Sequence, residues 1–245
     1  MNDTKHRGGA DTTETYRGIP VHAAPGVHQT VVDALMARLP RGAHVADVGA
    51  GQGALAQRLF DAGFVVSAFE LTDEGWLAPG VPCKVVDLGS AWSEVEAAGP
   101  FDAVVSVEVI EHLENPREFL RKIVRLAKEL PMTVVLTTPN PCDTFSAITL
   151  FRRGYFNWFS PQHYFGGGHI SILPFWLIDQ HLVYLGVQPG SWSFHSPFRH
   201  RTRLGNCLLQ LVRGLRSLIA RSDRKDYFDG ETAMTIIKLN PAPSR

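Results

Sequence analysis

The segment VEVIEHL, residues 107–113, places two carboxylates and an imidazole within five positions. If the chain becomes helical at Glu108, then Glu108, Glu111 and His112 have i, i+3, i+4 spacing and share one helical face. Together with His169 they would form a mixed oxygen and nitrogen site that suits Mg²⁺, Mn²⁺ or Zn²⁺. A cation held there would lower the pKa of an acceptor hydroxyl and orient it. The competing interpretation is a polar turn that orients a loop or contacts a cofactor without metal.

Histidines also occur in the aromatic segment RRGYFNWFSPQHYFGGGHIS, residues 152–171. This composition predicts the wall of an acceptor pocket, and the glycine run 166–168 predicts a loop that moves. Without a metal, the candidates for a general base are His163, His169 and His112. The alternative is a hydrophobic lid in which these histidines are only hydrogen-bonded.

The segment VADVGAGQG, residues 45–53, joins an apolar strand to a helix. Its glycines allow a sharp turn and a close approach to a ligand, and the helix N-terminus that follows can face a polar group. Glu70 and Asp87 end the next two strands, where carboxylates can accept hydrogen bonds from a ribose and an adenine. A nicotinamide dinucleotide is the alternative, but its G-x-G-x-x-G fingerprint requires a third glycine at position 54, which is Ala54.

Strand and helix patterns alternate along most of the chain. Strands are expected at 44–50, 65–71, 81–88, 101–109, 132–139, 187–196 and 232–240, and helices at 27–39, 53–63, 90–99, 116–130 and 172–186. This alternation predicts an α/β fold with a doubly wound, Rossmann-like, mainly parallel sheet. Residues 140–171 show no regular pattern and are interpreted as a lid or pocket wall.

The composition excludes several classes of protein. Hydrophobic residues make up 44% of the 245, so a full core can form, and 24 basic residues balance 24 acidic ones. Bulk charge therefore gives no reason to expect nucleic-acid binding. The three cysteines lack metal-site spacing, the N-terminus lacks an apolar signal, and no apolar run reaches 18 residues. These features predict a cytoplasmic protein.

A second helical pattern, RTRLGNCLLQLVRGLRSLIARSDRK, spans residues 201–225. Its apolar side chains follow a single stripe, and seven basic residues flank it: Arg201, Arg203, Arg213, Arg216, Arg221, Arg224 and Lys225. Packing on the domain, dimerisation, contact with an anionic membrane surface and binding of phosphates all remain open for this helix over 203–221.

The motifs VADVGAGQG, AFEL, VVDL, FDAVVSVEVIEHLENP and VVLTTPNP resemble, in order, those of the class I S-adenosylmethionine-dependent methyltransferases. The resemblance implies a seven-stranded sheet with an antiparallel last strand and a helical insertion before it. It also implies that the cofactor-binding residues are Asp47, Gly49, Ala50, Gly51, Gly53, Glu70, Leu71, Asp87, Leu88, Val107 and Glu108. The predicted division is a flexible segment over 1–26, the methyltransferase domain over 27–196 and 227–241, and the basic amphipathic insertion over 197–226.

The acceptor is predicted by resemblance alone. The motifs are similar to those of methyltransferases acting on glycans and natural products and of the quinone-biosynthesis O-methyltransferases, whose insertions meet membrane lipids. We therefore expect O-methylation of a small-molecule, glycan or lipid-linked acceptor, with peripheral membrane contact or dimerisation through the 203–221 helix. A more distant likeness to RNA 3′-terminal 2′-O-methyltransferases, which also carry E-x-x-E-H, is the second interpretation. A non-catalytic binding partner that keeps the fold is the third.

Overall fold

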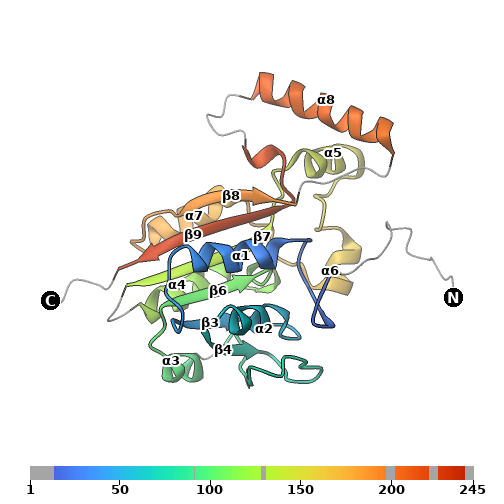
Figure 1. Cartoon of the computed structure of the whole chain (residues 1–245). Helices are drawn as coiled ribbons and strands as arrows, with labels where there is room; N and C mark the ends of the chain where they lie inside the picture. The colour runs from blue at the N-terminus through green and yellow to red at the C-terminus, as the bar shows by residue number, and fades with distance from the viewer. Residues whose placement is uncertain (1–13, 91, 128–130, 197–201, 221–225, 241–245) are drawn as a thin grey trace.

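The computed structural model describes residues 14–90, 92–127, 131–196, 202–220 and 226–240 (Figure 1). Seven strands form the main sheet: β3 (His44–Val48), β4 (Val65–Glu70), β5 (Cys83–Val85), β6 (Ala103–Val107), β7 (Met132–Pro139), β8 (Ser191–His195) and β9 (Thr232–Leu239). Their order is β5-β4-β3-β6-β7-β9-β8. Strands β3 to β7 pair in parallel, and β9 runs antiparallel to both neighbours. The predicted sheet, with its antiparallel last strand, is confirmed.

Eight helices surround the sheet in the described part of the chain: α1 (Val27–Met36), α2 (Ala54–Asp61), α3 (Ser93–Ala98), α4 (Pro116–Leu126), α5 (Thr144–Arg153), α6 (Pro161–Gly167), α7 (Phe175–Tyr184) and α8 (Arg203–Ile219). Two 3₁₀ turns, η1 (Ile110–His112) and η2 (Asp226–Phe228), complete the connections. Because strand side chains alternate between faces, neighbouring strand residues enter different cores. Val104 packs with the α3, α4 and α7 side, whereas Val105 packs with α1 and α2.

The carboxyl ends of the parallel strands meet at one edge of the sheet, because parallel strands share a direction. In Figure 1, α6 lies beside that edge, and α5 and α8 are stacked above it. The residues that follow β3, β4, β5 and β6 are thereby brought together. This edge is where the fold places its functional residues.

Residues 140–171 are more regular than predicted, because they contain α5 and α6. The Asp143 side chain caps α5 by accepting from the backbone N–H groups of Phe145 and Ser146. Ser160 caps α6, and Pro161 occupies its first turn. The glycine run is also not an open loop: Gly166 and Gly167 end α6, and Gly168 caps it with φ 72°.

The N-terminal region also differs from the expected flexible segment over 1–26. Residues 14–26, the part that the structure describes, include the antiparallel strands β1 (Thr15–Tyr16) and β2 (Ile19–Pro20). Glu14 pairs with Arg58 of α2, and the Tyr16 hydroxyl donates to Asp61 at 2.7 Å. These contacts fix the segment against α2, beside the glycine turn.

Helix α8 forms as predicted, but two of its three described arginines point toward the domain, whereas Arg203 is exposed. Arg213 is buried and pairs with Asp229 at 2.6 Å, and the Arg216 guanidinium lies 4.2 Å from the centre of the Phe228 ring. Arg201, Arg221, Arg224 and Lys225 fall outside the described residues. The exposed face is apolar, in agreement with the predicted stripe, with Leu204, Leu208, Leu211, Leu215, Leu218 and Ile219. The ion pair with Asp229 explains why Arg213 points inward.

Candidate active site

A cavity of about 760 Å³ opens at the carboxyl edge of the sheet. Its size falls within the range of small-molecule and cofactor sites. All the predicted cofactor-binding residues except Gly53 line it: Asp47, Gly49, Ala50, Gly51, Glu70, Leu71, Asp87, Leu88, Val107 and Glu108. Gly53 instead caps α2 with φ 94° and lies against Ala78 and Trp76, where a side chain would collide.

The glycine turn shapes the floor of this cavity. A Cβ atom at Gly49 would lie 2.3 Å from a methyl group of Val109, so only glycine fits between the strand and the η1 turn. Gly51 donates its backbone N–H to Glu70 at 2.7 Å, and Leu71 donates to the other oxygen of the same carboxylate at 2.8 Å. Two fixed donors therefore hold Glu70 in place at the tip of β4, as ribose recognition requires.

Asp87 and its loop form the next part of the wall. The Asp87 side chain accepts from the backbone N–H of Gly89 at 2.8 Å. Lys122 of α4 donates to the backbone carbonyls of Leu88, Gly89 and Ser90. The sequence interpretation missed Lys122, because a lysine within a helix and outside the motifs gives no local signal. Its three hydrogen bonds fix the loop that would frame an adenine.

Asp47 provides a test of whether the cavity fits a cationic ligand. Its side chain is 1% exposed, and one carboxylate oxygen has no hydrogen-bond partner among the described residues. Burial, with help from the nearby Glu70 carboxylate, raises the pKa of Asp47 to about 7. A buried acceptor without a donor is costly, so this oxygen calls for a ligand that donates or carries positive charge. The ammonium group of S-adenosylmethionine meets that requirement.

Two histidines that the sequence interpretation missed also line the cavity. His28 of α1 is 6% exposed, its Nδ1 has no partner in the described structure, and burial lowers its pKa to about 4. His22 approaches the Gln52 side chain at 3.3 Å. His22 belongs to the segment that was expected to be flexible, and His28 belongs to the first helix. The neutral His28 ring adds a polar group to the cavity without adding charge.

The VEVIEHL segment does not become helical at Glu108. Glu108 adopts φ 53°, an uncommon backbone conformation for a residue with a side chain, and the turn η1 begins only at Ile110. The predicted single face is therefore wrong. Glu108 and His112 line the cavity, whereas Glu111 is fully buried beside β7 and accepts from the Thr138 hydroxyl at 3.1 Å.

Glu111, His112 and His169 nevertheless converge. One potential ligand atom from each lies within 4.8 Å of the others, and the rings of His112 and His169 have centroids 4.8 Å apart. The second oxygen of Glu111 has no hydrogen-bond partner among the described residues and lies 3.9 Å from Nε2 of His112. Burial, and then the neighbouring Glu108 carboxylate, raises the pKa of Glu111 well above its ordinary value. Glu108 itself is not part of the converging group and accepts from the Thr137 hydroxyl.

The loop that carries His169 is fixed to the η1 turn. Ile170 and Ser171 both donate backbone N–H groups to the carbonyl of Glu111, at 3.0 and 2.9 Å. Nδ1 of His169 lies 2.8 Å from the carbonyl oxygen of Trp158, and because a carbonyl only accepts, Nδ1 carries the proton. Nε2 of His169 is then the nitrogen with a lone pair. A second hydrogen bond of this kind is the usual way that a metal-binding imidazole is oriented.

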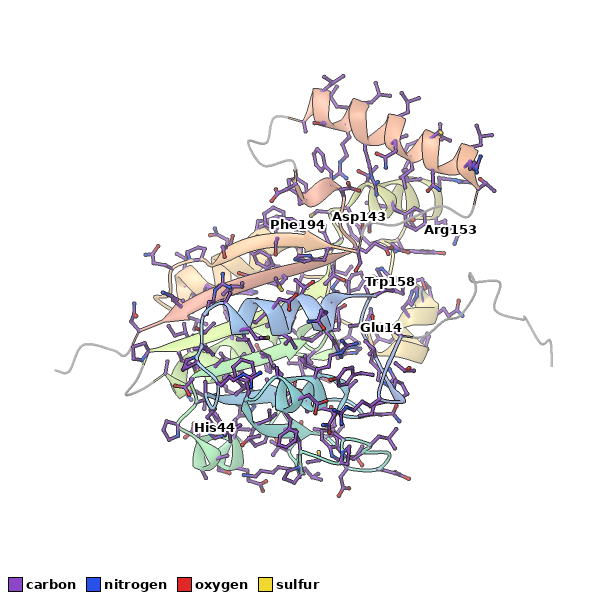
Figure 2. All side chains as sticks on the ribbon, viewed as in Figure 1. Glu14, His44, Asp143, Arg153, Trp158 and Phe194 are labelled. Atoms are coloured by element: carbon purple, nitrogen blue, oxygen red, sulfur yellow. The ribbon has the colours of Figure 1, made fainter. Side chains whose placement is uncertain are left out.

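The third predicted histidine lies farther out. His163 stacks with His169 at a centroid distance of 6.1 Å and bonds to the Ser160 hydroxyl at 2.8 Å. It does not line the cofactor cavity, whereas His112 does. The three imidazoles therefore form a row that runs from the cavity toward α6. Figure 2 places Trp158, whose carbonyl orients His169, on that side of the molecule.

Comparisons with known proteins agree with this arrangement. The family described as "Methyltransferase domain" matches residues 22–175. A ubiquinone biosynthesis O-methyltransferase of Caulobacter vibrioides is 34% identical over 126 residues, which cover 48% of this chain and 49% of that protein. One from Xanthomonas campestris pv. campestris is 31% identical over 204 residues, 76% of this chain and 80% of that protein. The chain thus spans about half the Caulobacter relative.

Solved structures share the fold. A SAM-dependent methyltransferase from Archaeoglobus fulgidus has a TM-score of 0.57 and 16% identity, covering 86% of this chain and 94% of that chain. Magnesium protoporphyrin IX methyltransferase from Synechocystis, solved with bound SAH, has a TM-score of 0.52 and 16% identity, covering 87% and 81%. At this level of identity the two likenesses establish the architecture and no acceptor.

Proposed function

The chain belongs to the methyltransferase-domain family, as a class I S-adenosylmethionine-dependent methyltransferase, and we propose that it methylates an acceptor hydroxyl held at a divalent cation. The observation that carries the proposal is the convergence of Glu111, His112 and His169 beside the cofactor cavity. The similar proteins named ubiquinone biosynthesis O-methyltransferases support oxygen as the acceptor atom. The acceptor is a small molecule or a lipid-linked molecule with adjacent oxygens.

In this proposal the cofactor half of the site acts mainly by alignment. Glu70 and Asp87, which line the cavity, would hold the adenosine, and Asp47 would accept from the amino group of the methionine part. The sulfonium methyl is already activated, so rate enhancement comes from holding the acceptor oxygen in line with the methyl–sulfur bond. Glu108 and His112 form the wall between the cofactor and the acceptor.

The acceptor half of the site, on the side of η1 and His169, would supply the ligands of the divalent cation. Glu111 contributes a carboxylate oxygen, and His112 and His169 contribute one nitrogen each, a donor set that suits Mn²⁺ or Zn²⁺ and tolerates Mg²⁺. A cation bound there would lower the pKa of an acceptor hydroxyl. The buried oxygen of Glu111 that has no partner among the described residues fits this role, because a cation would compensate a charge that burial otherwise neutralises.

Chelation tests the proposed function. Methyl transfer from labelled S-adenosylmethionine to catechol, a minimal adjacent diol, should fall to background in EDTA and return with Mg²⁺, Mn²⁺ or Zn²⁺. Short RNAs with a free 3′ ribose form a second arm, because the distant likeness to RNA 2′-O-methyltransferases predicts a metal too. Full activity in EDTA would refute the proposal that methyl transfer requires a divalent cation. His163, His169 and His112 would then be the candidates for a general base.

We further propose that the exposed face of α8 rests on a membrane surface from which a lipid-linked acceptor reaches the site. Five leucines and Ile219 are more than half exposed along this 17-residue helix, which contains no acidic residue. Phe151 of α5, the helix that α8 contacts, is 94% exposed. Such a contiguous apolar surface marks an interaction site. No helix in the described ranges combines the length and hydropathy needed to cross a bilayer.

Flotation tests this surface. The wild-type protein should float with vesicles of phosphatidylcholine and phosphatidylglycerol, and Leu208→Glu with Leu215→Glu should abolish flotation. Val183→Glu changes an exposed residue of α7 in the same way and should have no effect. A dimer that the double variant converts to a monomer, without any flotation of the wild type, would assign the face to a second copy instead.

A further inference from the structure

A second, smaller pocket lies between α5 and α6, outside the cofactor cavity. Its volume is about 200 Å³, enough for one ring or one acidic group but below the range of drug-sized ligands. Arg152, Arg153, Asn157, Gln162 and His163 line it together with aromatic side chains that include Tyr155 and Trp158. Among the described residues no carboxylate lines it, although Glu231 behind the wall accepts from the Asn157 amide. The lining therefore offers positive charge from Arg152 and Arg153.

The two arginines are available for a ligand. Both side chains are exposed, and neither guanidinium makes an ion pair with a carboxylate in the part of the chain that the structure describes. Arginines in the last turn of a helix also interact favourably with its dipole. The interaction with the helix dipole explains the arginines alone. It does not explain why side chains of α6 and aromatic side chains line the same pocket. A pair of guanidinium groups is suited to planar carboxylate or phosphate recognition.

The aromatic wall is held in a fixed position. Trp158 adopts φ 68°, a conformation that a bulky residue keeps only when its surroundings impose it. Its indole and the Asn157 amide both bond to the Glu231 carboxylate, and its carbonyl bonds to His169. Asn157 is also tied by its backbone N–H to the Ser146 hydroxyl at 3.0 Å. These bonds preorganise the wall before any ligand arrives.

The pocket shares a wall with the proposed cation site. His163 lines the pocket and stacks with His169, which in turn contacts His112 at the rim of the cofactor cavity. Figure 2 shows Arg153 and Trp158 on the same side of the molecule. A ligand with its acid group between the arginines would extend past Trp158 toward the imidazoles.

We infer that this pocket binds a carboxylate or phosphate group of the acceptor, so that the preferred acceptor is an aromatic or small adjacent diol with an anionic substituent. The inference rests on the proposed function, because it assigns an acceptor to the same site. Arg152 and Arg153 determine specificity in it and are not catalytic residues. They should therefore affect affinity for the acceptor and leave the rate of methyl transfer from bound acceptor unchanged.

The test compares catechol with 3,4-dihydroxybenzoate, which differs from it by one carboxylate. Calorimetry in the presence of S-adenosylhomocysteine and Mn²⁺ should show at least ~10-fold tighter binding of the benzoate, equal to about 1.4 kcal/mol. Arg152→Gln with Arg153→Gln should remove that preference without changing catechol binding. Arg203→Gln, an exposed arginine of α8, is the matched control and should change neither. Inorganic phosphate should compete with the benzoate.

The outcomes separate this inference from the proposed function. Equal binding of both diols to the wild type, a preference that survives in the double variant, or no competition by phosphate would overturn the inference. In methylation assays the double variant should raise KM for the benzoate and keep kcat. Arginine-dependent binding of a benzoate that is never methylated would instead refute the proposed function while the anion site stands.

Discussion

The two halves of the carboxyl edge are built differently. On the cofactor side, Asp47, Glu70 and Asp87 lie at or just beyond the ends of β3, β4 and β5, and backbone N–H groups fix the carboxylates of Glu70 and Asp87. On the acceptor side, the functional residues come from η1, α6 and the loop after it, which are brought together by contacts distant in sequence. The cofactor half is a property of the sheet, whereas the acceptor half is assembled on it.

This difference separates what is general from what is specific. Strand ends can be filled with the same few residue types in many proteins, because the sheet and the loops next to it position them. The acceptor half depends on the fit of separate segments, such as Gly168 against His112, where a Cβ atom would lie 3.3 Å from Nδ1. Variants in the two halves should therefore fail in different ways: loss of cofactor affinity on one side and loss of turnover on the other.

The largest effect is expected from the proposed cation ligands. Glu111→Gln and His169→Ala should each lower kcat/KM at least ~100-fold, about 2.7 kcal/mol of transition-state stabilisation, while binding of S-adenosylmethionine stays within a factor of two or so. His181→Ala, on α7 away from the site, is the control. Steady-state kinetics beside calorimetry makes the distinction. Equal losses of cofactor affinity and turnover would break the proposed separation of the halves.

The next effect concerns Glu70, at the tip of β4. Its carboxylate should make charge-assisted hydrogen bonds to the ribose, worth roughly 1.5–3 kcal/mol each. Glu70→Ala should weaken S-adenosylmethionine binding at least ~10-fold. Glu74→Ala, an exposed acid in the loop that follows, should leave it unchanged. Titration calorimetry that finds unaltered affinity, or a preference for NADH, would contradict the cofactor assignment.

The smallest effect is a pH dependence of folding stability in the acceptor half. Burial, and then Asp143, raises the pKa of Glu231 from 4.5 to about 7. The protonated carboxyl is therefore favoured in the folded state, and its stabilising contribution is complete below about pH 4.5 and lost as pH rises through 7. Urea unfolding of Glu231→Gln should show a decline between pH 5 and 8 that is ~1–3 kcal/mol smaller than in the wild type. Parallel pH profiles for the two proteins would show that Glu231 does not titrate in this range.

The cofactor half could be predicted from the sequence because the prediction needed only local patterns. Alternating strands and helices define the edge, and a carboxylate that ends each strand must lie on it. For the acceptor half, the sequence predicted candidate residues but not their arrangement in space. The spacing of Glu111 and His112 suggested that their side chains converge. Glu108 does not join them, because its backbone is left-handed, and that conformation depends on Thr137 and the packing of β7.

Other differences have similar causes. The caps Asp143 and Ser160–Pro161 are local signals that could have revealed α5 and α6, although the aromatic composition obscured the helical period. The inward direction of Arg213 could not be read from its helix, because its partner Asp229 is 16 residues away beyond α8. His28 and Lys122 gave no signal, since their roles arise only where α1 and α4 reach the cavity.

The central claim is that an acceptor half with a cation site adjoins a cofactor half that is complete in the sheet. A crystal structure of the protein with S-adenosylhomocysteine and Mn²⁺, with anomalous diffraction measured for manganese, tests it most directly. We predict an anomalous peak bounded by Glu111, His112 and His169, beside a cofactor whose ribose contacts Glu70. A fully occupied cofactor with no manganese peak at these three residues would contradict it.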